Sequence, residues 1–81
     1  MNNDILQITD MYIILVESST MQSKLIKQQL QQLGISSIGI AKNGQQALEL
    51  MCQDMPDLVI SSMYLTDMTG TDLVTSMRNN D

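Results

Sequence analysis

The stretch MYIILVESST, residues 11–20, joins an unbroken apolar run to a cluster of hydroxyl side chains. An aliphatic and β-branched run of this length is typical of a strand that is buried on both faces of a parallel sheet. The hydroxyls of ESST (17–20) are good helix N-caps, so we expect a helix to follow at once. The segment from Met21 to Leu33 has the spacing of an amphipathic helix. Its expected inward residues are Leu25, Ile26, Leu30 and Leu33.

The alternation of strand and helix repeats twice along the rest of the chain. The expected strands are SSIGIA (36–41) and DLVIS (57–61), and the expected helices are QQALELMCQ (45–53) and TDLVTSMR (71–78). Strands that alternate with helices predict a parallel sheet with right-handed crossover connections and helices on both faces. We therefore expect an α/β fold of three layers.

The length of 81 residues bounds the protein to one small domain, near the size at which a single core becomes marginal. Residues 1–10 are polar with scattered apolar positions, and we expect a flexible lead-in there, followed by the domain at residues 11–81. The N-terminus lacks the positive region and the long apolar run of a signal peptide, and no apolar run approaches membrane-spanning length. We expect a cytoplasmic protein with no membrane partner.

Charge and residue usage exclude several kinds of site. The formal net charge is −5, and the four basic residues are scattered at Lys24, Lys27, Lys42 and Arg78. Nucleic-acid binding needs clustered cations, so we expect no nucleic-acid partner. With one cysteine and no histidine, the chain has neither a disulfide framework nor a ligand set for a soft metal ion. Gly-rich phosphate-binding motifs are also absent, which disfavours a nucleotide site.

Two longer motifs carry a family likeness. AKNGQQAL (41–48) is similar to the pattern A-x-N-G-x-E-A-L, and PDLVI (56–60) followed by GTDL (70–73) is similar to P-D-L-V-I-x-D-x-x-M-P-x-M-D-G-x-x-L. With these motifs in this order, the chain from Tyr12 to Arg78 resembles the receiver domain of bacterial two-component response regulators. The resemblance implies a flavodoxin-like sheet of order 2-1-3-4-5. This chain would supply the order 2-1-3 and remain incomplete after the third helix.

The resemblance also implies a phosphorylation site, which is degenerate here. Receivers accept a phosphoryl group on an aspartate at the end of the third strand. Mg²⁺ assists and is held by that aspartate and by an acidic pair after the first strand. The matched positions are Ser62 for the phosphoacceptor and Glu17 and Ser18 for the acidic pair. Only Glu17 is a carboxylate, so the formal charge falls from about −3 to about −1 and most of the attraction for Mg²⁺ is lost. We expect no Mg²⁺, no other cofactor and no catalytic residue.

A serine at the phosphoacceptor position leaves alternatives open. The simplest is that Ser61 and Ser62 end a strand, with hydroxyls that satisfy nearby backbone groups and with Glu17 bonded to a neighbouring serine. Another is weak, Mg-dependent phosphorylation at Ser62 or Glu17, although no histidine is present to act as a base for the hydroxyl. Asp57 and Asp67 offer no replacement carboxylate, because the first opens the strand at its opposite end and the second lies in the following loop.

A retained scaffold with a degenerate site favours a non-enzymatic signalling module that acts by protein–protein binding. Complete receivers add two further strands, so the third strand would be an open edge here. That expected edge consists of Asp57, Leu58, Val59, Ile60 and Ser61. An open edge presents unpaired N–H and C=O groups to another chain, so we expect a protein partner or a homodimer. Either the sequence is the N-terminal part of a longer regulator, or the short chain covers its open side by dimerising.

Overall fold

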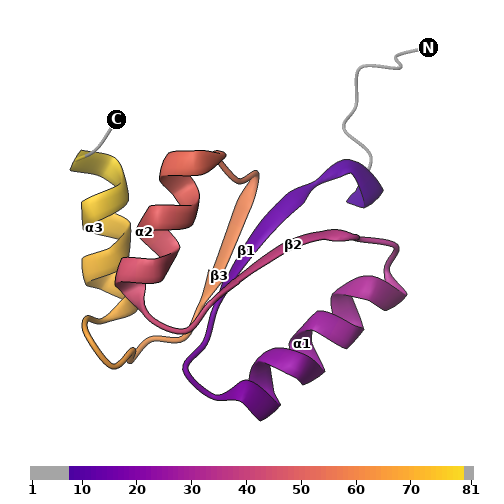
Figure 1. The fold of residues 1–81 in the computed structure, drawn as a ribbon, viewed down its shortest axis with the longest axis horizontal. Coiled ribbons are helices and arrows are strands. Elements are labelled where there is room, and N and C mark those ends of the chain that lie inside the picture. Colours follow the sequence, from indigo (N-terminus) through magenta and orange to yellow (C-terminus); the bar gives the residue numbers. More distant parts are fainter. Residues whose placement is uncertain (1–7, 80–81) are drawn as a thin grey trace.

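The computed structural model describes residues 8–79, which alternate between strands and helices (Figure 1). The strands are β1 (Tyr12–Val16), β2 (Ser37–Ala41) and β3 (Leu58–Ser61). The α-helices are α1 (Thr20–Gln32), α2 (Gly44–Gln53) and α3 (Gly70–Asn79). A short 3-10 helix, η1 (Ile8–Asp10), precedes β1, so the end of the expected lead-in has regular backbone. Residues 1–7, its remainder, lie outside the described residues, as do residues 80–81.

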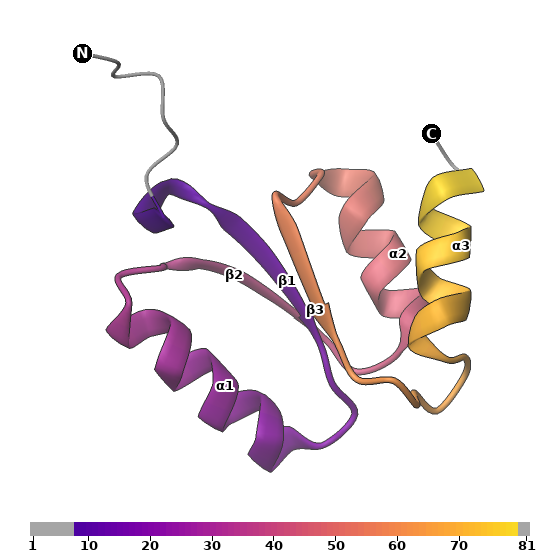
Figure 2. The same cartoon turned by 180° about the vertical axis from the view of Figure 1, so that it is seen from behind.

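The strands form one parallel sheet in the order β2-β1-β3, which confirms the predicted fold class (Figure 2). The central strand is β1, in which Ile14 is the register partner of Gly39 in β2 and of Val59 in β3. One face of the sheet is covered by α1, and the other by α2 and α3. Among residues 8–79, no helix has both the length and the apolar character that crossing a membrane requires.

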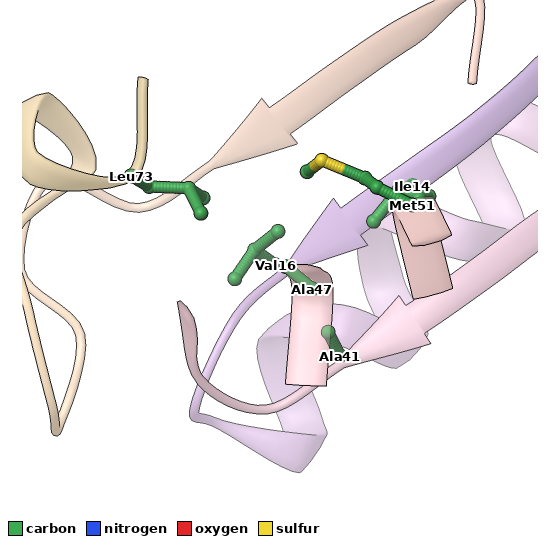
Figure 3. Packing of buried hydrophobic residues seen from close by; sticks show 6 residues of the cluster. All are labelled: Ile14, Val16, Ala41, Ala47, Met51 and Leu73. Atoms are coloured by element: carbon green, nitrogen blue, oxygen red, sulfur yellow. The ribbon is translucent and has the colours of Figure 1, made fainter. Parts of the chain in front are cut away.

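The main core lies between the sheet and the pair of helices α2 and α3 (Figure 3). Its buried residues are Ile14, Val16, Ala41, Ala47, Met51 and Leu73. Ile14 and Val16 face this layer together because alternate residues of a strand point to the same side. Ala41 and Ala47 are small, which lets α2 approach the sheet closely. Leu73, only 1% exposed, anchors α3 to the same core.

The opposite face of the sheet is covered by α1 alone, and one sequence expectation is wrong there. Ile13 and Leu15 of β1 are buried on this face. The buried and half-buried residues of α1 are Ser23, Ile26, Lys27 and Leu30. They have the i, i+3, i+4, i+7 spacing of a single helix face. Leu25 and Leu33, expected to point inward, are 51% and 59% exposed. The expected and the observed inward faces of α1 share Ile26 and Leu30, so the periodicity of the apolar residues alone cannot distinguish the two faces.

Polar side chains set the start of each α-helix. Ser19 accepts a first-turn amide of α1 at 3.3 Å, and Asn43 accepts one of α2 at 2.8 Å. At α3 the two caps are reciprocal, because Thr69 accepts the amide of Asp72 at 3.0 Å and Asp72 accepts the amide of Thr69 at 3.2 Å. The predicted capping role of the serine cluster after β1 is thus confirmed at Ser19.

The third strand begins one residue later than the sequence pattern predicts. Asp57 precedes β3, and its carboxylate accepts the amide of Tyr12 at 2.8 Å. The amide of Asp57 also donates to the carbonyl of Tyr12, at 2.8 Å. Asp57 is therefore directed at β1 and not at the open side of the sheet. The strand edge that remains for an interaction is Leu58–Ser61.

Candidate functional site

Glu17 and Ser62 meet at the carboxyl edge of the sheet. Glu17 directly follows β1, and Ser62 directly follows β3. The two strands are neighbours in the sheet. The amide of Ser62 donates to the carbonyl of Val16 at 3.1 Å, and the amide of Glu17 donates to the carbonyl of Ala41 at 3.0 Å. The hydrogen bonds of the sheet thus extend one residue past each strand, which fixes the backbone beneath both side chains.

Both carboxylate oxygens of Glu17 accept hydrogen bonds. The Ser62 hydroxyl donates to Oε1, and the amide of Ser19 donates to Oε2 at 3.0 Å. The Ser62 hydroxyl is the main cause, and the Ser19 amide the next, of a Glu17 pKa that lies below its ordinary value of 4.5. A carboxylate with a lowered pKa is a weaker base, so Glu17 is less able to take the proton of the Ser62 hydroxyl. The hydroxyl stabilises the charge of Glu17.

The set of donors at this edge does not fit Mg²⁺. Ser18 is exposed in the loop after Glu17, where the family pattern would place a second acid. What remains is one carboxylate, already bonded on both oxygens, together with neutral hydroxyls. Mg²⁺ requires hard, preferably charged oxygen ligands in octahedral geometry. Within residues 8–79 no three acidic, histidine or cysteine side chains gather into a possible metal site.

Sequence reasoning missed the part that Asp67 plays beside this site. Its carboxylate, in the loop after β3, accepts the amide of Gly44 at 2.8 Å and the amide of Gln45 at 2.9 Å, both in the first turn of α2. These two bonds, in that order, lower the pKa of Asp67 below its ordinary value of 3.8. One signal was available in the sequence: the first turn of α2 has no acid of its own, although negative charge is favourable there.

The open edge of β3 has a defined set of free backbone groups. The amide of Ser62 points to β1, and successive amides of a strand alternate in direction. The amides and carbonyls of Val59 and Ser61 therefore point away from β1, toward the open side. Leu58, also in this strand, is 44% exposed. Within residues 8–79 no strand pairs with this side of β3.

Removing the Ser62 hydroxyl should raise the pKa of Glu17. In Ser62→Ala we expect the pKa to move up toward 4.5, because the largest cause of its lowering is gone. Since the folded value is depressed, the bond stabilises the fold at neutral pH, and this contribution is lost as pH falls through the folded pKa. A carbon-13 NMR titration of the Glu17 carboxyl measures the change. Ser61→Ala is the control, because the Ser61 hydroxyl donates to the Ser62 carbonyl and not to Glu17. Equal Glu17 titrations in both variants would contradict the role given to Ser62.

The fold and the edge define a class of protein: a small three-layer α/β domain with its polar site beyond the carboxyl ends of parallel strands. Residues 13–81 match the family model of the response regulator receiver domain, so the chain belongs to this family of signalling modules. A search of curated proteins gave no match. Among solved structures, the chain is similar to a double mutant of the anti-anti-sigma factor PhyR from Bartonella quintana, with 26% sequence identity and a TM-score of 0.77. The likeness covers 91% of this chain and 32% of that one, so the chain spans about a third of that protein's length.

Proposed function

We propose that this chain is a cytoplasmic receiver-like module that takes no phosphoryl group on an aspartate and signals by binding protein. The observation that carries the proposal is the hydrogen bond from Ser62 to Glu17. Ser62 stands at the position where the family has its phosphoacceptor, and it offers a neutral hydroxyl in place of a carboxylate. The single charge of Glu17 is balanced by donors within the chain, so a metal ion would have to displace them to bind.

The retained scaffold supports a role in protein binding. Residues 13–81 match the receiver family and keep the strand order 2-1-3, whereas two of the three matched acidic positions are serines. The similar PhyR is described as an anti-anti-sigma factor, a name that denotes action on an anti-sigma factor. For this chain we propose the same kind of activity, which is recognition by surface contacts without chemistry at the strand ends.

The test is a phosphorylation assay on the unmodified chain. Incubation with acetyl phosphate and Mg²⁺ should leave the intact mass unchanged, and beryllofluoride with Mg²⁺ should leave the NMR signals of Glu17 and Ser62 in place. A typical phosphorylatable receiver in the same tube serves as the positive control. A saturable phosphoryl adduct on the chain would overturn the proposal and favour the alternative, which is weak Mg-dependent phosphorylation at Ser62 or Glu17.

For the partner we propose a second copy of the chain, paired through β3. A two-fold axis at Ile60 would place Val59 of each copy opposite Ser61 of the other. These are the residues whose backbone groups point outward, so both sets would be satisfied in one antiparallel pair. Leu58 and Val74, which are 44% and 45% exposed, lie at this side of the molecule and line the same groove with Met77. Because each copy carries a charge of −5, added salt should strengthen the association.

A further inference from the structure

Asp67 joins the loop after β3 to the first turn of α2. Its carboxylate oxygens accept the amides of Gly44 and Gln45 at 2.8 and 2.9 Å, from positions 23 and 22 residues away in the chain. The first amides of any α-helix have no partner inside the helix, and its N-terminus favours negative charge. A carboxylate from a distant loop therefore completes this helix.

The loop also packs closely on the helix beside these hydrogen bonds. Gly44 is buried, and a Cβ atom placed on it would lie 2.3 Å from Sδ of Met68. Any side chain at Gly44 would therefore displace the Met68 side chain from its place on α2. The close approach depends on the glycine on one side and on the Asp67 carboxylate on the other.

Residues 62–69 have internal contacts that hold the loop together as a unit. The amide of Leu65 donates to the carbonyl of Met68 at 2.9 Å, and the amide of Gly70 donates to the carbonyl of Met63 at 2.6 Å. Tyr64 and Thr69 also form an isolated antiparallel bridge. When the loop leaves α2 we expect these internal bonds to weaken as well, because Met68 takes part in them and also packs on Gly44.

We propose that residues 62–69 are a latch on α2 that closes when Asp67 is charged and opens when Asp67 is neutral. In the open state the loop withdraws from the helix, Met68 and Gly44 are uncovered, and α3 is loosened at its first residue, Gly70. The hydrogen bonds that hold the latch on α2 come from Asp67, and neither the Ser62 hydroxyl nor the open edge of β3 takes part in them.

Three charged groups stand on the elements next to the latch. Lys42 stands before α2, Asp72 is in the first turn of α3, and Glu17 follows β1. None of these three groups is a cause of the shift in the Asp67 pKa, which comes from the bonds to the Gly44 and Gln45 amides and is opposed by burial. The two amide bonds hold the pKa of Asp67 below 3.8, so the latch is closed at neutral pH. Because the folded pKa is depressed, the latch weakens only as pH falls below about 4.

Amide exchange in the full chain tests the latch. In Asp67→Asn at neutral pH we expect the Gly44 and Gln45 amides to exchange about tenfold faster or more, together with the amides of Leu65 and Gly70. Amides of β1 should keep their rates, which shows that the fold is intact. Asp54→Asn is the matched control, because it removes the same charge from an exposed position outside the loop and should change none of these rates.

Two results would overturn the latch. If Gly44 and Gln45 lose protection while Leu65 and Gly70 keep theirs, Asp67 is a helix cap and the loop does not open. If none of these amides changes, the carboxylate bonds do not hold the loop in solution. Should Asp67→Asn fail to fold, a pH titration of the unmodified chain decides. The Gly44 amide and the Met68 methyl group should then shift together below about pH 4, and separate transitions would contradict a common opening.

Discussion

Ser18→Asp combined with Ser62→Asp is expected to give the protein a Mg²⁺ site. Three carboxylates would then stand at the carboxyl edge of the sheet, with Glu17 between them, and their charge of about −3 attracts a hard divalent ion. Without the ion, an aspartate at position 62 would face Glu17 directly. We expect this like-charge contact to lower the free energy of unfolding by about 1–3 kcal/mol, because it replaces a hydrogen bond by repulsion.

Thermal unfolding with and without Mg²⁺ measures both effects. At a Mg²⁺ concentration ten times the dissociation constant, binding should stabilise the double variant by about 1.4 kcal/mol. For a domain of this size that corresponds to a rise in Tm of roughly 5–10 °C. The unmodified chain should show no comparable rise. Ser36→Asp with Ser37→Asp, which puts the same two charges at the opposite end of β2, is the matched control. A Tm that responds equally to Mg²⁺ in all three proteins would refute the assignment of the site.

Ser61→Pro is expected to abolish self-association through β3 while the monomer stays folded. Proline has no amide hydrogen, and the Ser61 amide points outward, so no hydrogen bond inside the sheet is lost. Across a two-fold axis the change removes two hydrogen bonds, one from each copy. At about 0.5–1.5 kcal/mol each, their loss weakens the dimer by roughly 5-fold to 150-fold, before any clash of the proline ring.

Light scattering over a range of protein concentrations reports the oligomeric state, and circular dichroism checks the fold. Ser61→Ala keeps the backbone amide, so this control should dimerise like the unmodified chain. A dimer that survives in Ser61→Pro would place the interface elsewhere. A monomer at all concentrations in the unmodified chain would rule out self-association and leave a different protein as the partner.

The strands and their order were the most predictable part of the structure. The apolar run of β1 is too short for an independent helix, and three residues after its end Ser19 caps α1. The alternating order of elements then restricts the sheet to parallel pairing. The family motifs placed Glu17 and Ser62 correctly at adjacent strand ends, which the hydrogen bond between them reflects.

The errors arise at polar side chains whose surroundings the local sequence pattern does not show. Ser23 and Lys27 lie on the inward stripe of α1, and neither is apolar enough to mark that face in the sequence. Asp57 looks like the first residue of a strand, yet its carboxylate accepts the Tyr12 amide 45 residues away. Asp67 looks like a loop residue, yet it completes a helix that starts more than twenty residues earlier. Local sequence patterns carry no information about such contacts, because the contacts depend on which segments lie side by side in the folded protein.

The burial of β1 on both faces has a consequence for how the molecule unfolds. Ile13 and Leu15 belong to the layer under α1, whereas Ile14 and Val16 belong to the layer under α2 and α3. Neither layer can lose β1 without removing the central strand from the other. We therefore expect a single cooperative transition, in which the far-ultraviolet signal and the fluorescence of Tyr12 change together. The protein would then have no stable half-folded form, although each of its two layers is thin.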